Sequence, residues 1–185
     1  MSGLYLLVVV GIWAGLTSLF IKGWRRWRAQ SGERRRVDAL CLVIALLWLG
    51  ASFWYGGGRK IYYDTLVNRM CREDGGVKVY ETVKLPANRF EKGGMVNFYR
   101  PTQNENALGP EYEFKYEITY YRQGNPDMFR MHTQIIRRAD GKLLGESVFY
   151  KRGGGDLPGP WHGSSYMCPE LSVANDVLRQ VFIRE

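Results

Sequence analysis

The sequence predicts a membrane protein with a two-helix transmembrane hairpin and a small extracytoplasmic α+β domain built on an antiparallel sheet. Three observations lead to this fold class. Two long apolar runs lie near the N-terminus, an arginine-rich segment separates them, and segments of period two follow in the rest of the chain. The hairpin is expected at residues 1–56 and the outer domain at residues 57–185.

The first apolar run, residues 4–21, contains no ionisable side chain of the Asp, Glu, Lys, Arg or His type, and the second, residues 37–55, contains only Asp38. A transmembrane helix needs about 20 mostly apolar residues. A cleaved signal peptide would need positive charge before its apolar run, and residues 1–21 contain no Lys or Arg. The runs therefore predict two membrane-spanning helices, with a hairpin that does not fully cross the bilayer as the alternative.

The segment between the runs, residues 22–36, holds seven Lys and Arg residues against one acid, Glu33. Short loops rich in Lys and Arg stay in the cytoplasm, where this one can contact anionic membrane lipids. The N-terminus and the C-terminal domain are then expected on the outer side. In a bacterium this describes a two-pass inner-membrane protein with both parts in the periplasm.

The net charge of +8 does not indicate nucleic-acid binding, because of where the charge lies. Residues 57–185 carry 19 Lys and Arg against 16 Asp and Glu, so the outer domain is close to balanced. A nucleic-acid surface needs basic residues clustered on the folded domain. We therefore expect membrane lipids, and no nucleic acid, among the partners.

The clearest strand in the outer domain is predicted at residues 111–120, where apolar side chains occupy every second position from Tyr112 to Tyr120. This strict alternation is typical of a strand with one buried and one solvated face. A turn at 123–127 and the dipeptide Asp140-Gly141 predict a meander. Further strands are expected at 77–85, 95–99, 128–138 and 142–150.

Two helices are predicted in the outer domain, at residues 61–72 and 171–183, from apolar positions at helical spacing. The last four residues of the second segment fit a closing strand equally well. Three consecutive glycines at 56–58 are expected to form a flexible joint before the first helix. The prediction is a sheet of four or five strands covered on one face by one or two helices.

Two of the three cysteines, Cys71 and Cys168, lie in the outer domain, and the third, Cys41, lies in the second apolar run. Thiols outside the cytoplasm are commonly oxidised. We therefore predict a Cys71–Cys168 disulfide. Two buried thiols are the alternative, and two thiols without further ligands do not indicate a metal site.

The chain contains no HExxH, Walker A or dinucleotide-binding motif, and only two histidines, His132 and His162. No nucleophile-elbow sequence surrounds the serines that follow His162. The apolar runs also lack the deep ionisable residues that transport sites usually require. We expect no catalytic residues, no metal and no cofactor.

Candidate partner-binding residues are Trp161, His162 and Tyr166, in a long loop rich in glycine and proline. Trp161 folded back onto the sheet is the competing interpretation. Gly11 and Gly15 are small residues four positions apart, which allow close helix packing. They fit either packing against the second span or a docking face for a homo-oligomer or another membrane protein.

The resulting functional hypothesis is a non-enzymatic, inner-membrane-anchored protein whose periplasmic domain binds another envelope protein. An accessory or inhibitory subunit fits this layout, as in superinfection or entry exclusion, by analogy of architecture alone. Two alternatives remain open: a periplasmic ligand- or lipid-binding module, and a membrane-tethered enzyme. An enzyme is expected to gather polar groups around His132 or His162 in a cleft.

Overall fold

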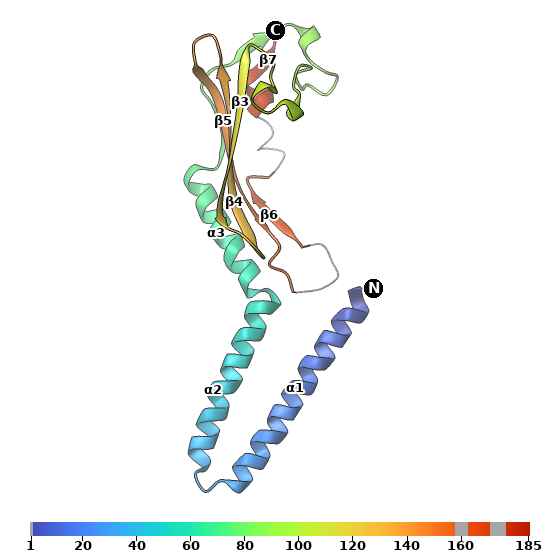
Figure 1. Cartoon of the computed structure of the whole chain (residues 1–185), viewed down its shortest axis with the longest axis vertical. Coiled ribbons are helices and arrows are strands. Elements are labelled where there is room, and N and C mark those ends of the chain that lie inside the picture. The colour runs from blue at the N-terminus through green and yellow to red at the C-terminus, as the bar shows by residue number, and fades with distance from the viewer. Residues whose placement is uncertain (1, 158–162, 171–176) are drawn as a thin grey trace. The chain divides into compact units, whose positions relative to one another are not determined.

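The computed structural model describes residues 2–157, 163–170 and 177–185. The chain divides into two compact units, Met1–Arg59 with Gly155–Gly163 and Lys60–Gly154 with Ser164–Glu185. Two long apolar helices belong to the first unit, and an antiparallel sheet belongs to the second (Figure 1). At this level, the predicted combination of two apolar N-terminal helices and a small α+β domain is confirmed.

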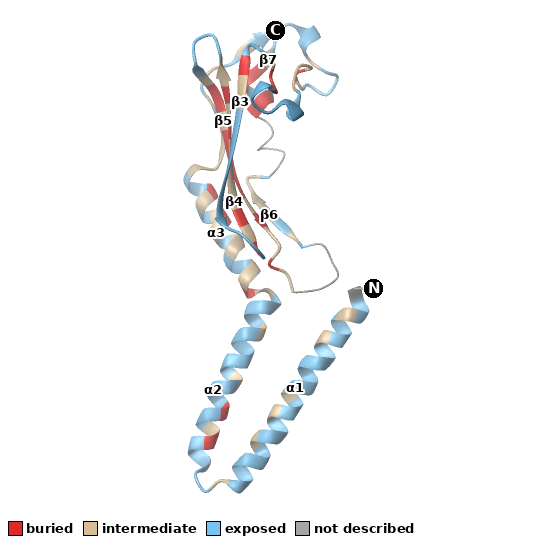
Figure 2. Ribbon diagram, in the orientation of Figure 1, coloured by how far each residue is buried: buried red, intermediate tan, exposed pale blue. Residues whose placement is uncertain are grey.

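The helical unit contains α1 at Ser2–Gln30 and α2 at Arg34–Phe53. Both helices are long and apolar enough to cross a membrane, and most of their large apolar side chains are exposed (Figure 2). The arginine-rich segment is mostly helical, because the turn between the helices comprises only residues 31–33. Beside this turn, Asp38 accepts a hydrogen bond from Trp24 Nε1 at 3.0 Å and pairs with Arg28 at 3.3 Å.

The glycines expected as a flexible joint lie in a π-helical turn, η1, at Trp54–Gly58. Gly57 departs from helical geometry, with φ 166° and ψ −17°, so the turn is kinked there. A Cβ added to Gly58 would lie 2.7 Å from a ring carbon of Phe53, which explains a glycine at this close approach. Helix α3 follows at Arg59–Asp74, which confirms the helix predicted at 61–72.

Five antiparallel strands form the main sheet, in the order β1-β5-β4-β3, with β6 paired to β5. Their bounds are Gly76–Val79 for β1, Tyr112–Arg122 for β3, Asp127–Arg137 for β4, Lys142–Gly153 for β5 and Ser165–Cys168 for β6. The strands β3, β4 and β5 are the predicted meander. Strand β6 was not predicted, because its four residues carry no clear alternation.

A second, two-stranded sheet pairs β2, Val83–Leu85, in parallel with β7, Phe182–Arg184. The single strand predicted at 77–85 is wrong, because the backbone N–H groups of Tyr80 and Glu81 both bond to the carbonyl of Leu144. β1 ends at this turn, and the chain then continues as β2 in the other sheet. The C-terminal strand predicted as an alternative to helix is present as β7, but β7 pairs with β2 and does not close the main sheet.

Short helices complete the domain: η2 at Ala87–Arg89, η3 at Pro101–Asn106 and α5 at Val177–Val181. The strand predicted at 95–99 is wrong, since only an isolated bridge joins Phe90 to Val96. Helix α5 confirms the last part of the helix predicted at 171–183. Residues 171–176 of that prediction lie outside the described residues.

Two apolar cores lie on opposite faces of the main sheet. One core packs against α5, where a Cβ added to Gly145 would meet a methyl group of Val181 at 2.6 Å. The other packs against α3 and includes Val148 of β5 with Val67 of α3. Residues 145 and 148 of one strand point to opposite faces, so helices cover both faces of the sheet. The prediction of helices on one face only is wrong in this respect.

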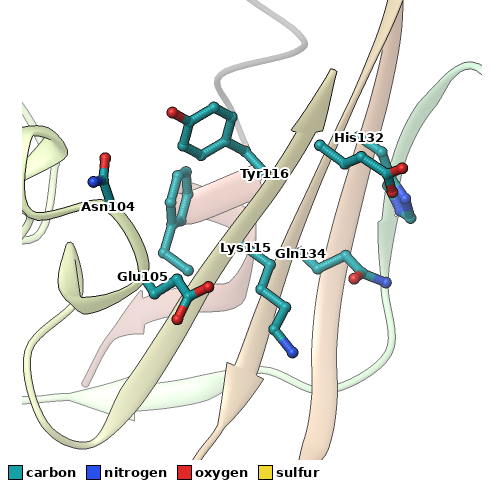
Figure 3. Close-up of a pocket in the computed structure, with 8 residues that line it drawn as sticks. Asn104, Glu105, Lys115, Tyr116, His132 and Gln134 are labelled. Atoms are coloured by element: carbon teal, nitrogen blue, oxygen red, sulfur yellow. The ribbon is translucent and has the colours of Figure 1, made fainter. Parts of the chain in front are cut away.

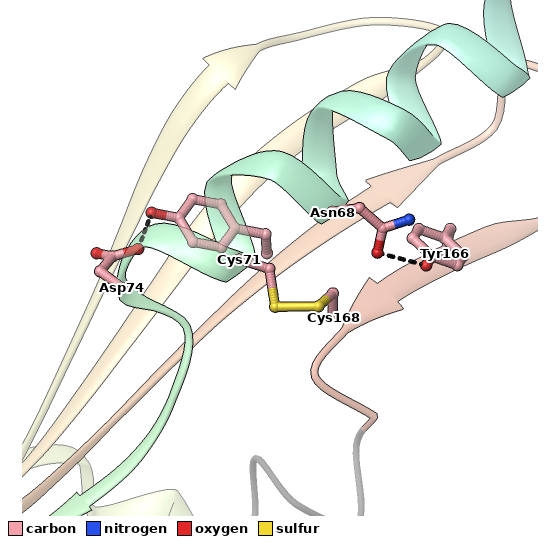
Figure 4. Close-up of a disulfide and its surroundings, with 6 residues drawn as sticks. Asn68, Cys71, Asp74, Tyr166 and Cys168 are labelled. Atoms are coloured by element: carbon pink, nitrogen blue, oxygen red, sulfur yellow. Dashed lines mark hydrogen bonds between the residues drawn. A yellow bond between two sulfur atoms is a disulfide. The ribbon is translucent and has the colours of Figure 1, made fainter.

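Helix α3 is fastened to the sheet by a covalent bond and by buried polar pairs. The predicted Cys71–Cys168 disulfide is present, with 5.9 Å between the two Cα atoms (Figure 4). Arg152 of β5 is 1% exposed and donates from Nε to Asp64 Oδ1 at 2.6 Å. Arg152 also donates hydrogen bonds to the backbone carbonyls of Gly154, just after β5, and Ser164, just before β6. Its guanidinium group is therefore surrounded by acceptors.

Candidate functional site

Strand β3 presents an exposed row of large side chains on one face. Tyr116 is 50% exposed, Ile118 39% and Tyr120 51%. These three positions belong to the alternating set that was expected to be buried, and only Tyr112 of that set is fully buried. The prediction of a continuous buried face is therefore wrong beyond the first residues of the strand.

The row is exposed because of the position of β3 in the sheet. β3 ends the strand order and pairs with β4 alone within the described chain. The core beside α5 reaches Tyr112 and the half-buried Phe114, and the remainder of β3 extends past it (Figure 2). An edge strand has one neighbouring strand, so its outer side lacks the pairing and the side-chain neighbours that a second strand would supply.

The neighbouring strand β4 extends this apolar surface. Phe129 lies opposite Tyr120 with ring centroids 5.4 Å apart, and Met131 lies opposite Ile118. Directly opposed residues share a face of the sheet. We define the β3 patch as Tyr116, Ile118 and Tyr120 of β3 with the half-buried Phe129 and Met131 of β4.

A cleft of about 380 Å³ lies along the N-terminal half of β3. Asn104 and Glu105 of η3 form one side, and residues of β3 and β4 form the rest, as Figure 3 shows. The strand residues that line it are Phe114, Lys115, Tyr116, Glu117, His132 and Gln134. The cleft therefore joins the polar side chains of one face of β3 to the first member of the β3 patch.

Polar groups gather around Glu146 of β5 next to this cleft. His132 Nε2 lies 2.8 Å from one carboxylate oxygen of Glu146, and Tyr80 Oη donates to the other at 2.6 Å. Lys78 Nζ lies 3.8 Å from the same carboxylate. The hydrogen bond from Tyr80 lowers the pKa of Glu146 and, with burial, raises the pKa of Tyr80.

Each oxygen of Glu146 accepts one hydrogen bond, and a carboxylate oxygen can accept two. The cluster can therefore form an ion pair or accept a hydrogen bond from a further polar group. His132 is the one predicted histidine that the structure describes, and it does lie in a cleft among polar groups. Across the described ranges 2–157, 163–170 and 177–185, no group of three or more His, Cys, Asp and Glu side chains is arranged to hold a metal ion. Nothing in the cluster supplies an activated nucleophile.

Of the three loop residues predicted for partner binding, the structure describes only Tyr166. Trp161 and His162 lie outside the described residues. Tyr166 of β6 is half-buried, packs against the core beneath α3, and donates from Oη to Asn68 Oδ1 at 2.7 Å (Figure 4). Tyr166 therefore contributes to the packing of β6 on α3, a role that loop composition alone did not indicate.

Gly11 and Gly15 lie on α1 in open surroundings. A Cβ added to either would meet no atom of the described chain within 4 Å, so α2 does not pack against this face. Further along, α1 and α2 instead enclose an apolar cleft of about 420 Å³, whose lining residues include Thr17 of α1 and Trp48 of α2. Docking of another helix on the Gly11 and Gly15 face stays a prediction.

The β3 patch was missed because the alternation of β3 was interpreted as a buried face. One sequence signal was available: the alternating positions are held by Tyr more often than by Val, Leu or Ile. Tyrosine joins a large apolar ring to a polar tip and is enriched at interfaces.

Comparison with protein-family models, curated proteins and solved structures gives no significant match to this chain.

Proposed function

We propose that the protein is a non-enzymatic membrane-anchored binding protein, whose outer domain engages another envelope protein as an accessory or inhibitory subunit. In this proposal α1 and α2 form a two-pass anchor in a bacterial inner membrane, with the N-terminus and the sheet domain in the periplasm. The observation that carries it is the exposed β3 patch, with Tyr116 and Tyr120 each about half exposed.

The placement in the membrane is supported by the exposed apolar surface of α1 and α2, which lipid would cover. The basic residues on both sides of the turn at 31–33 favour a cytoplasmic position for that turn. The Cys71–Cys168 disulfide fits an oxidising compartment such as the periplasm. The apolar cleft between the helices would be filled by lipid chains or by a partner helix.

Partner binding is supported by the chemistry of the β3 patch. Contiguous exposed apolar side chains on a small domain mark interaction sites, and tyrosines are frequent binding hot spots. The patch lies on an edge strand, whose free backbone groups offer additional hydrogen bonds to a partner. By analogy of architecture alone, exclusion of superinfecting phage or of incoming plasmid DNA is a process that such a subunit would serve.

Site-specific photo-cross-linking in native membranes tests this proposal. A photoreactive residue at Tyr120, inside the patch, is expected to give an adduct with a different envelope protein. Tyr80 provides the matched control, because it is 56% exposed and lies outside the patch. Adducts that are absent at Tyr120, or equally abundant at Tyr80, would contradict the proposal. Tyr120→Ala should weaken co-purification of the same partner.

A second candidate function, binding of a small polar ligand, is favoured by the cleft beside His132 and Glu105. This function predicts that a small molecule stays with the purified protein. Native mass spectrometry should then find one added mass per chain, and His132→Ala should abolish it. The enzyme alternative predicts turnover that the same variant removes.

A further inference from the structure

We infer that two copies of the chain pair edge to edge through β3, so that the β3 patches of both copies form one continuous binding surface. This inference rests on the proposed function, since it describes how the partner-binding surface is completed. The occupant of the free edge is thus a second copy of the same strand.

The first step is the free edge itself. Within the described chain, β3 pairs only with β4, and all residues from Lys115 to Arg122 are exposed. No proline interrupts β3, and no other described strand covers its outer side. An edge of this kind presents unpaired N–H and C=O groups to another strand. The register shift between Tyr120 and Arg122 ends the regular edge on one side.

The second step is the charge pattern along that edge. In an antiparallel pair related by a two-fold axis through Tyr116, Lys115 of each copy lies opposite Glu117 of the other copy. On the opposite face, Tyr116 meets Tyr116 of the second copy, and Phe114 meets Ile118. Both charge pairs are attractive and the apolar side chains meet apolar side chains, which are favourable cross-strand combinations.

Neighbouring registers do not offer this match. An axis through Lys115 or through Glu117 places that residue against the same charge in the second copy, which is destabilising. An axis through Ile118 leaves Lys115 and Glu117 without opposite charges. An axis through Phe114 pairs Glu113 with Lys115, but it also places Glu111 against Glu117, which carry the same charge. The axis through Tyr116 is therefore the register that gives attractive charge pairs without a like-charge pair, and this self-complementarity indicates a second copy as the occupant.

The third step is the space beside the edge. The cleft of about 380 Å³ lies between Phe114, Lys115, Tyr116 and Glu117 of β3 and the residues Asn104 and Glu105 of η3, so η3 borders the edge beside the N-terminal half of β3. Lys115 Nζ already lies 3.3 Å from Glu113 of its own strand, and half of the Lys115 side chain remains exposed for the second carboxylate. Copies anchored in one membrane would also meet at a high effective concentration.

Cysteine cross-linking of the full-length protein tests the pairing and its register. In a Cys41→Ser background, which removes the remaining free thiol of the described chain, Tyr116→Cys is compared with Thr119→Cys. Directly opposed residues have Cα atoms roughly 5 Å apart, within disulfide range. Two copies of residue 119 would be about 20 Å apart at six residues of offset. A covalent dimer is expected from the first variant and not from the second.

Charge exchange provides a second test that does not depend on cysteine chemistry. Lys115→Glu and Glu117→Lys each place like charges opposite each other twice, and each should weaken self-association about tenfold. The double variant restores both attractive pairs and should restore the dimer. Sedimentation of the purified full-length protein in detergent measures the three dimer fractions.

The outcomes separate this inference from the proposed function. Equal cross-linking at positions 116 and 119, or a double variant as weak as the single ones, would overturn self-pairing. A heterologous adduct at Tyr120 from a strictly monomeric protein would overturn self-pairing and leave the proposed function standing. A dimer with the expected register but without any envelope partner would support self-pairing and contradict the proposed function. A disulfide between the Tyr116→Cys variant and a different protein would show another occupant at this edge and overturn the inference.

Discussion

Strands β3 and β5 belong to one sheet and have similar lengths, 11 and 12 residues, yet they are buried to very different degrees. β3 has the regular alternation of a half-buried strand and is mostly exposed. β5 has an irregular sequence that includes Arg152 and is mostly buried. The difference follows from their neighbours, because β5 is paired on both sides and packed on both faces. Alternation thus predicts that a strand forms, and the pairing decides whether it is buried.

The charged side chains of the two strands also lie in different surroundings. On β5, the side chain of Arg152 is buried and held by Asp64 of α3 and by backbone carbonyls. On β3, Lys115 and Glu117 face solvent. Substitutions at the buried positions of β5 should therefore change folding stability, whereas substitutions at the exposed positions of β3, from Lys115 onward, should change association and leave stability almost unaltered.

The largest effect is expected from Arg152→Ala. The substitution leaves Asp64 partly buried without its cation, and losing one partner of a buried ion pair typically costs about 3–5 kcal/mol. Denaturant unfolding of the full-length protein in detergent, followed by near-ultraviolet circular dichroism, measures this loss. Lys115→Ala on β3 is the matched control and should cost less than about 0.5 kcal/mol. Similar losses in both variants would contradict the proposed division between the strands.

A loss of similar size is expected when the bond between α3 and β6 is removed. Cys71 and Cys168 are 97 residues apart, and losing a native disulfide typically costs about 2–5 kcal/mol. The double variant Cys71→Ser/Cys168→Ser should show this loss in the same unfolding measurement. Reduction of the parent protein should produce the same change and should have no effect on the double variant. If reduction destabilises both proteins equally, the effect does not arise from this bond.

A matched pair of apolar truncations tests the comparison directly. Leu144 of β5 is fully buried, and Leu144→Ala should cost about 2–5 kcal/mol. Ile118 of β3 is 39% exposed, and Ile118→Ala should cost less than about 1 kcal/mol. Partner capture should show the reverse order, with the greater loss for Ile118→Ala. Equal destabilisation by the two variants would indicate that the β3 patch is covered within the folded domain.

The smallest expected effect is a pH dependence from Glu146 of β5. The hydrogen bond from Tyr80 lowers the pKa of Glu146 in the folded protein below its ordinary value of about 4.3. The resulting stability is present above the ordinary pKa and is lost as the pH falls through the lowered pKa. Unfolding midpoints measured from neutral to acidic pH should fall less steeply in Glu146→Gln. Tyr80→Phe, which removes the donor, should show an intermediate slope.

The fold was largely predictable where local patterns decide the structure. The apolar runs, the hairpin around Asp140-Gly141 and the helix α3 depend on composition and short-range periodicity. The split of residues 77–85 into β1 and β2 was not predictable, because it depends on the carbonyl of Leu144 some 60 residues later. Strand β6 is defined by pairing with β5 rather than by its own sequence.

The candidate site was less predictable than the fold. Tyr166 was expected at a binding surface because it follows a glycine-rich loop, but it is half-buried, packs against the core beside α3 and donates a hydrogen bond to Asn68 of α3. The residues of the β3 patch fit a buried strand and an exposed strand equally well, so their sequence alone does not reveal the patch. Its exposure follows from the edge position of β3, which depends on the order of all five strands.

The Cys71–Cys168 bond also determines how the domain would carry a mechanical load. The chain enters the domain through α3, and the β3 patch lies between the two cysteines in the sequence. A pull applied between α3 and Tyr120 therefore divides at Cys71 into two covalent routes. One route runs forward along the chain to β3, and the other crosses the sulfur bridge to β6 and returns through β5 and β4. A partner that pulls on the patch would load both routes of this covalent ring at once, so neither route can extend unless the other extends with it.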